Sequence, residues 1–428
     1  MLEFLTFLIT LLVLLLVSQR LKEVDAISLE ALFYVFYSVY AVLGALSLIL
    51  RLDERRLNDV IINYDILYFI WMISTIGFLC LVLLVSIIKR RFNRHRRTLS
   101  FTNESYSDSA IVFLSLFIVF VSFVHFNLSD APLSILLKGG DVQDAFIARQ
   151  SQITSYGFFK LSHFNFLTRE VQFFWCCFLF SFFLKTKRLK WILFLCTFSM
   201  LVSFYSNLSK AGGLFLLAAY GLIYLNHIRK SLNLIVVLSG ILVIVILAVI
   251  PQYLFIPSDQ EFDFLKYFKA VFSRIVSGQI EPAYYVINFI DSTDFLYGST
   301  FPNPKAIFPF EHFDLETKTW EIMNPTRLSM GLSYKNPTVF WVDGYANFGI
   351  FGVIVYYLIV VAILVLIDSF FLRKSEVTSI DIGFIMYISF HYSRLSGKSL
   401  STFFWDVDIA VVIIFYLISR KMIIKNRV

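Results

Sequence analysis

The sequence predicts an all-α polytopic integral membrane protein with about eleven transmembrane helices and a large, partly helical external loop. Of its 428 residues, 58% are hydrophobic and only 16% are charged, whereas a soluble domain has ~25% charged residues. The apolar residues form runs close to the ~20 residues that an α-helix needs to cross a membrane. Backbone polar groups in lipid must be satisfied within the segment, so these runs must be helices. This composition excludes an ordinary soluble enzyme, a disordered chain and a disulfide scaffold.

Eleven apolar segments are the expected membrane spans. They cover residues 2–17, 27–50, 66–88, 109–125, 170–184, 191–205, 211–225, 232–250, 338–368, 379–391 and 407–419. The first run has the length of a signal peptide, but Glu3 stands where a basic residue is expected and no small-residue cleavage site follows. We therefore expect it to remain as the first span. The four cysteines lie inside apolar runs without metal-binding spacing, which is typical of small apolar side chains.

The positions of Lys and Arg indicate an orientation. Six stretches alternate onto one side of the membrane, at 18–26, 89–108, 185–190, 226–231, 369–378 and 420–428. About one residue in three is basic there, against about one in ten in the opposite loops. Cytoplasmic loops carry the excess of Lys and Arg, so the sequence predicts a cytoplasmic C-terminus. The net charge of +7 is then mainly a topology signal, and no nucleic acid is expected as a partner.

The chain divides into three predicted parts. Residues 1–250 form an N-terminal bundle of about eight helices with an external loop at 126–169, residues 251–337 form a large external loop, and residues 338–428 add about three helices. The large loop contains eight of the nine prolines. Because proline breaks regular elements and long structureless loops are uncommon, we expect a folded external region there.

Local patterns predict helices inside both external loops. Apolar residues at helical spacing are Phe264, Phe268, Val271, Phe272 and Ile275, with basic residues between them. This amphipathic helix either lies on the outer membrane interface or covers the bundle. A second helix is expected at 282–290, because proline fits a first turn, and a short helix in the first loop should carry Arg149.

Motifs for soluble catalysis are absent from the sequence. No phosphate-binding glycine loop, zinc spacing or nucleophile elbow occurs. The cytoplasmic stretches of at most 20 residues are too small for an ATPase or a nucleotide-sugar domain. The activated substrate must therefore come from the membrane or from outside, and no metal or cofactor is expected.

External cations beside helix ends are candidate phosphate ligands. They are Arg149, Lys210, Arg274, Arg327, Arg394 and Lys398. Arginine forks match phosphate oxygens and lysine acts as a point charge, so several of them together would bind a lipid diphosphate. The alternative is that each side chain reaches separately to lipid headgroups. Three small residues follow Lys210, which lets a ligand approach closely.

Asp343 is the carboxylate that the sequence singles out. The apolar stretch around it is 31 residues long, and Asp343-Gly344 and Asn347-Phe348-Gly349 interrupt its first third. Either the helix projects outward, or its start is broken and lines a cavity; an ionisable group at membrane depth is a functional candidate. The alternative is a helix-start Asp in the interface. Further general-base candidates are Glu321, His312 and His391, although a lone histidine is often a satisfied structural residue.

Four short segments resemble the bacterial O-antigen (Wzy-type) polymerases, a family of oligosaccharide repeat unit polymerases. Tyr345–Gly352 shows the pattern Tyr-x-Asn-Phe-Gly-x-x-Gly near the end of the large loop. Leu208-Ser209-Lys210-Ala211 resembles the helix start before that loop, Arg149 with Gly157 resembles the first-loop segment, and Tyr297-Gly298-Ser299 resembles a Gly-Ser segment.

The resemblance implies a glycosyltransferase that polymerises undecaprenyl diphosphate-linked oligosaccharide repeat units at the periplasmic face of the inner membrane. Its partners would be this lipid substrate, membrane lipid, a chain-length regulator and a flippase. Arg149, Lys210, Arg274 and Arg327, with Arg394 and His391, would bind the diphosphate; Asp343 would be the general base, with Glu321 second. An O-antigen ligase, which transfers polysaccharide to lipid A–core, is the closest alternative. A flippase or transporter would predict internal repeats and small loops.

Overall fold

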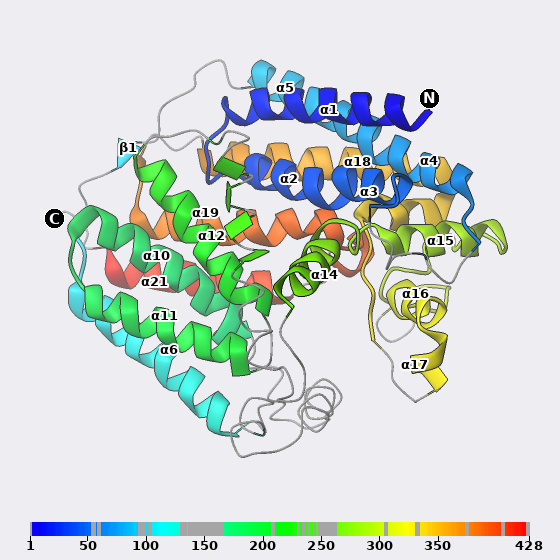
Figure 1. Ribbon diagram of the computed structural model, residues 1–428. Coiled ribbons are helices and arrows are strands. Elements are labelled where there is room, and N and C mark those ends of the chain that lie inside the picture. The colour runs from blue at the N-terminus through cyan, green and yellow to red at the C-terminus, as the bar shows by residue number, and fades with distance from the viewer. Residues whose placement is uncertain are drawn as a thin grey trace.

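The structure of the protein is a computed structural model. It describes residues 2–52, 57, 61–92, 100–101, 105–128, 135, 166–206, 210–228, 232, short pieces between 236 and 246, 263–303, 307–329, 334–372, 376–403 and 407–424. These residues are helical, with connecting turns and one parallel pair of two-residue strands, β1 (Ser100–Phe101) and β2 (Glu376–Val377). Figure 1 shows the helices and both termini.

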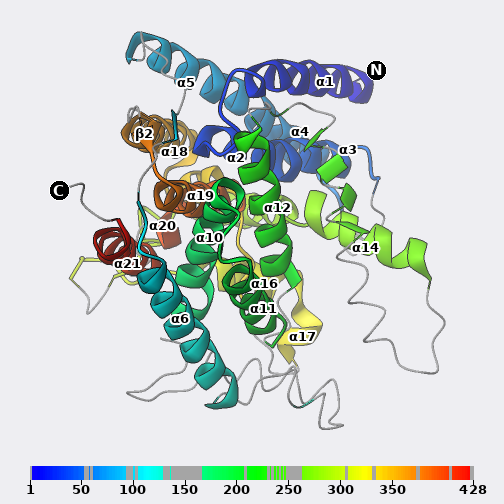
Figure 2. The ribbon, with the colours of Figure 1, turned by 90° about the vertical axis from the view of Figure 1, so that its left-hand side faces the viewer.

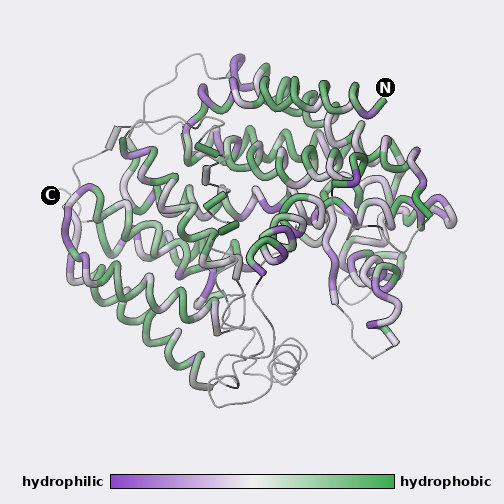
Figure 3. Tube along the Cα trace, viewed as in Figure 1, coloured by the Kyte–Doolittle hydropathy of each residue, from purple (hydrophilic) through white to green (hydrophobic). Residues whose placement is uncertain are grey.

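Six described helical stretches are long and apolar enough to cross a membrane. They are Leu2–Leu21 (α1), Leu29–Ile49 (α2, η1 and α3), Tyr64–Arg91 (α4, η2 and α5), Asp108–Phe126 (within α6, Asp108–Leu128), Phe166–Thr186 (η3 and α10) and Phe340–Phe370 (within α18, Phe340–Leu372). Each coincides with a predicted span, so the prediction of a helical membrane protein is confirmed at this level. Hydrophobic residues dominate these helices in Figure 3.

The second and third stretches are continuous helices with changes of helical type. The second comprises α2 (Leu29–Tyr37), η1 (Ser38–Leu43) and α3 (Gly44–Ile49), and the third comprises α4 (Tyr64–Met72), η2 (Ile73–Gly77) and α5 (Phe78–Phe92). The fifth comprises η3 (Phe166–Val171) and α10 (Gln172–Thr186). Such π-helical turns inside α-helices are frequent at functional sites.

Four further predicted spans are shorter helices in the structure. They are α11 (Lys190–Ser206), α12 (Lys210–His227), α19 (Ser379–Ser393) and α21 (Val407–Ile423). The predicted span at 232–250 and the external loop at 126–169 lie mostly outside the described residues. The total of about eleven spans therefore stays a prediction.

The large loop is partly helical in the region that the structure describes. It contains α14 (Phe264–Val276), α15 (Glu281–Asp291), α16 (Leu315–Met323) and α17 (Pro325–Ser329). The predicted helices at 264–275 and 282–290 are confirmed as α14 and α15, the second with proline in its first turn. Between α19 and α21 the chain forms the short helices η5 (Arg394–Gly397) and α20 (Leu400–Phe403).

The helices pack into two hydrophobic cores rather than one. The first core joins α1 to α5 with α15 and α18, and the second joins α6, α10, α11, α12, α19 and α21. Helix α2 packs against α19 and so connects the two cores (Figure 2). The predicted N-terminal bundle at 1–250 thus contributes to both cores, and the C-terminal helices are divided between them.

Most of the basic stretches gather at one end of the molecule. Arg188 pairs with Asp108, β1 pairs with β2, and Tyr106 forms a bridge with Ile424. This end carries β1 and the C-terminus on the left of Figure 1, whereas α15 to α17 lie on the right. Described parts of the stretches at 89–108, 185–190, 369–378 and 420–428 therefore lie together at this end.

Three buried charged side chains, with the partly exposed Arg20 beside them, form a network at the same end. Lys89 Nζ lies 2.6 Å from Glu30 Oε2 and 2.6 Å from Asp368 Oδ2, and Arg20 Nε lies 3.0 Å from Glu30 Oε1. Asp368 also accepts hydrogen bonds from the backbone N–H groups of Leu29 and Glu30, which open α2. Arg20 also pairs with the exposed Glu23 (2.6 Å), and the four side chains of the network connect α1, α2, α5 and α18.

Helix α18 is broken near its start. Phe348 has φ −141° and ψ 19°, and Gly349 has φ 60° and ψ −146°, a conformation open essentially to glycine alone. Of the two alternatives for this long apolar stretch, the structure shows the broken helix. Gly344 and Gly352 face each other across the break, where a Cβ on Gly352 would lie 2.0 Å from the carbonyl oxygen of Gly344.

Gly352→Ala is therefore expected to destabilise the protein by about 1–3 kcal/mol, because the new methyl group meets backbone that must shift. The matched control is Gly221→Ala in α12, where an added Cβ has nothing within 4 Å and alanine favours a helix. Thermal unfolding of the detergent-purified variants measures the difference. Equal unfolding temperatures for the two variants would contradict the close contact at Gly352.

Candidate functional site

Two of the segments that carry the family resemblance are hydrogen-bonded to each other at the break in α18. The backbone N–H of Tyr297 donates to the carbonyl of Asn347 (3.1 Å), and that of Gly298 donates to Asn347 Oδ1 (2.8 Å). Asn347 Nδ2 donates to Thr300 Oγ1 (2.7 Å). Gly298 has φ +92°, which favours glycine. The Tyr-Gly-Ser and Tyr-x-Asn-Phe-Gly segments thus form one structural unit.

Asp343 lies one turn before Asn347 and is completely buried. Its exposed fraction is 0%. Asn347 Nδ2 donates to Oδ1 (3.2 Å), and the backbone N–H of Ser401, in α20, donates to Oδ2 (2.9 Å). Asp343 therefore connects the start of α18 to α20, with both carboxylate oxygens directed at protein donors.

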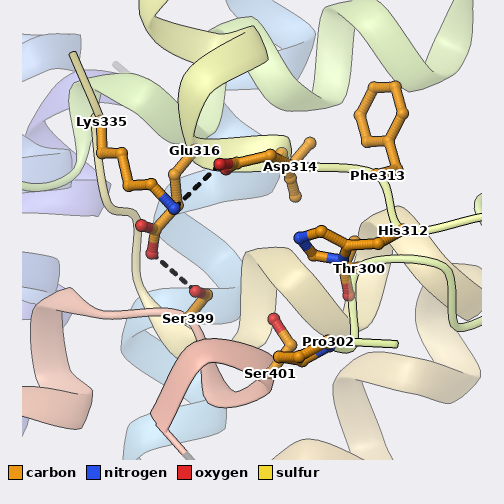
Figure 4. A pocket seen from close by; sticks show the side chains of 10 residues that line it. Thr300, Pro302, His312, Phe313, Asp314, Glu316, Lys335, Ser399 and Ser401 are labelled. Atoms are coloured by element: carbon orange, nitrogen blue, oxygen red, sulfur yellow. Dashed lines mark hydrogen bonds and ion pairs between the residues drawn. The ribbon is translucent and has the colours of Figure 1, made fainter. Parts of the chain in front are cut away.

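A cavity of about 230 Å³ adjoins this unit (Figure 4). Its walls come from the chain after α15, the start of α16, the segment before α18 and the segment around α20. The lining residues are Thr300, Pro302, His312, Phe313, Asp314, Leu315, Glu316, Lys335, Ser399 and Ser401. Thr300 and Ser401, which contact Asn347 and Asp343, are both part of the lining, so Asp343 lies directly behind the cavity wall.

Two carboxylates and one ammonium group line the cavity. Ser399 Oγ donates to Glu316 Oε1 (2.7 Å), and Lys335 Nζ lies 2.8 Å from Asp314 Oδ2. Asp314 also caps α16 by accepting from the backbone N–H of Thr317. Burial raises the pKa of Asp314, but the hydrogen bonds from Lys335 and Thr317 outweigh it and hold that pKa below its usual value. Asp314 is therefore a carboxylate at neutral pH.

The predicted cations do not line this cavity in the part of the chain that the structure describes. Arg274 on α14 and Arg327 on α17 are exposed. Lys210 is the first residue of α12, as predicted, and its side chain is outside the described part. Arg149 and Gly157 also lie outside the described residues.

The remaining predicted site residues contact other parts of the molecule. Arg394 opens η5 and lies 3.3 Å from Glu170 in η3. His391 ends α19 and is buried, with its ring 4.8 Å from that of Phe403. Glu321 is on α16 but pairs with Lys318 (3.3 Å) and does not line the cavity. Among the predicted site residues that the structure describes, His312 lines the cavity and Asp343 lies behind its wall.

Helix α14 is packed against the bundle at its C-terminal end and exposed at its N-terminal end. Its last turn packs on the bundle, since Ser273 and Val276 are buried and the carbonyl of Val276 lies 2.5 Å from the position of a Cβ on Gly44. Phe264 and Leu265 at the other end are 47% and 58% exposed. Figure 2 shows α14 extending outward from the bundle. Only the C-terminal part covers other helices, which leaves the N-terminal part available to an interface.

The sequence reasoning missed most of the cavity lining. Asp314 could have been recognised as an N-cap, because aspartate before an apolar-periodic segment caps a helix. The second signal is the run from Ser393 to Ser401, where serine occurs four times between two apolar helices. No local pattern identifies Glu316 or Lys335, because their role depends on segments that meet only in the fold. Among the described residues, no group of three or more His, Cys, Asp or Glu is arranged to hold a metal ion.

No protein-family model, curated protein or solved structure matches this chain. The fold and the site by themselves define a helical membrane protein with a polar cavity at the broken start of one of its long apolar helices.

Proposed function

We propose that this protein is a membrane glycosyltransferase that joins undecaprenyl diphosphate-linked oligosaccharide repeat units, as O-antigen polymerases do. One observation carries the proposal. The two segments Tyr297–Ser299 and Tyr345–Gly352, on which the family resemblance partly rests, meet at the break in α18 and border a cavity that contains carboxylates.

The orientation proposed from Lys and Arg makes this cavity periplasmic. Asp343 and Asp368 lie near opposite ends of α18, and Asp368 belongs to the basic end of the molecule. If the basic end faces the cytoplasm, the cavity faces the periplasm and the C-terminus is cytoplasmic. A lipid-linked donor is the activated sugar that reaches the periplasmic face without a nucleotide.

The proposed reaction is a displacement at the anomeric carbon of the donor chain. A hydroxyl of the acceptor sugar forms the new C–O bond, the bond from the anomeric carbon to the diphosphate oxygen breaks, and the hydroxyl proton passes to a carboxylate. A general base must reach the attacking hydroxyl. Because Asp343 is completely buried and Glu316 lines the cavity, we assign the base to Glu316. Asp343 is then a positioning residue for Asn347 and the segment around Ser401.

The lipid diphosphate requires cations, which stabilise the negative charge that develops as it leaves. The cavity cannot supply them, because its one ammonium group is held by Asp314. The diphosphate would therefore bind outside the cavity, and Arg149, Lys210, Arg274 and Arg327 remain its proposed ligands. The exposed apolar end of α14 would border the lipid route. A chain-length regulator and a flippase would be partners.

Deletion of the gene followed by gel electrophoresis of lipopolysaccharide tests the proposed function. We expect the deletion strain to make core lipopolysaccharide with a single repeat unit and no long polymer, and a plasmid copy to restore the ladder. Loss of all O-antigen, single repeats included, would indicate a ligase or a flippase instead. An unchanged ladder would exclude all three functions.

A further inference from the structure

The cavity is small for a ligand site. Its volume of about 230 Å³ is below the ~300–1,000 Å³ of most small-molecule pockets. A complete oligosaccharide repeat unit does not fit in such a space, whereas a single sugar ring does. The cavity therefore suits one residue of a larger chain, with the rest of the chain outside.

The lining is arranged for hydroxyl-rich ligands. Carboxylates accept hydrogen bonds from hydroxyl groups, and side-chain hydroxyls both donate and accept. Glu316 and Asp314 are held in place by Ser399 and Lys335, so their positions are fixed before a ligand enters. Figure 4 shows these side chains and those of Thr300 and Ser401 around the same space. Phe313 and Pro302 add apolar surface for the C–H face of a ring.

The charges of the lining distinguish between kinds of sugar. Lys335 is the one ammonium group among the ten lining residues and already pairs with Asp314. A carboxylate on the ligand would face Glu316 at close range without a new cation to neutralise it, and like charges at short distance repel. An uncharged ring meets no such repulsion, and an amino group would be attracted.

We propose that this cavity is a subsite for one uncharged or amino sugar ring of the acceptor and that it excludes acidic sugars. The assignment to the acceptor rests on the proposed function, because Glu316 would then accept the proton of the sugar hydroxyl. The binding of the ring itself depends only on the cavity.

Ligand-observed saturation-transfer NMR on the full-length protein in nanodiscs tests the proposal. The probes are the methyl glycosides of glucose, N-acetylglucosamine, glucosamine and glucuronic acid. We expect transfer to at least one uncharged or amino sugar, and binding of the glucuronide about tenfold weaker or absent. Glu316→Gln should reduce this discrimination, and Lys318→Met, on α16 but outside the lining, should preserve it.

The outcomes test the sugar subsite and the polymerase function separately. Binding of none of the four sugars, or equal binding of the glucuronide to the wild-type protein, would overturn the subsite. If sugars bind as expected but the deletion strain keeps its polymer ladder, the subsite stands and the polymerase function fails. If the ladder is lost but no sugar binds, the function stands and the subsite fails.

Discussion

Replacement of Lys89 by methionine should destabilise the protein by about 3–5 kcal/mol, the usual cost of removing one partner from a buried ion pair. Lys89 Nζ contacts both Glu30 and Asp368 at 2.6 Å, and the side chain of Glu30 is completely buried. Without Lys89, Glu30 would keep its pair with Arg20, whereas Asp368 would lose the ion pair that the described part of the chain gives it. Unfolding by SDS in mixed micelles, followed by circular dichroism, measures the loss.

Two further variants isolate the cause of this destabilisation. Arg91→Met changes an exposed basic residue in the same helix and should alter stability by no more than about 0.5 kcal/mol. The double variant Lys89→Met with Asp368→Asn leaves the pair of Arg20 and Glu30 balanced, so it should recover part of the loss through a favourable coupling energy. Wild-type stability of Lys89→Met alone would show that the buried network does not hold the helices together.

The same network shows where prediction from the sequence ends. The basic stretch at 89–108 and the apolar span at 338–368 were both predicted, each from its own composition. The contact of Lys89 with Asp368 joins them across 279 positions, and the hydrogen bond from Leu29 to Asp368 spans 339. No periodic pattern connects such positions. Helices α14 and α15 were predicted because apolar spacing and a first-turn proline act within a few residues.

The candidate site was likewise predictable only in part. The break in α18 was one of two predicted alternatives, because Asp343-Gly344 and Asn347-Phe348-Gly349 interrupt an apolar run. The partner segments were not predictable, since Ser401 lies 58 positions from Asp343 and Ser399 lies 83 positions from Glu316. The sequence points to Glu321 on α16, but only the fold shows that Glu316, five residues earlier on the same helix, lines the cavity.

Glu316→Gln should lower the rate of polymer formation by about 10²–10⁴-fold, because that is the usual contribution of a general base. Glutamine keeps the shape of the side chain and an acceptor oxygen for the hydroxyl of Ser399, so the protein should remain folded and abundant in the membrane. The measurement is the incorporation of labelled lipid-linked repeat units into polymer by purified protein, with the protein amount checked on a blot. Glu321→Gln, on the same helix but outside the cavity, is the matched control and should retain activity.

The pH dependence of the same reaction separates the base from the positioning residue. A general base must be deprotonated to act, so the wild-type rate should fall toward acidic pH. Glu316→Gln should abolish this acidic limb, and the small residual rate should be nearly independent of pH in that range. Asp343→Asn should reduce the rate but keep the limb, because Asp343 fixes the segment around Ser401 without receiving the proton. If the limb disappears in Asp343→Asn and persists in Glu316→Gln, the base is Asp343 and the assignment made from the cavity lining is wrong.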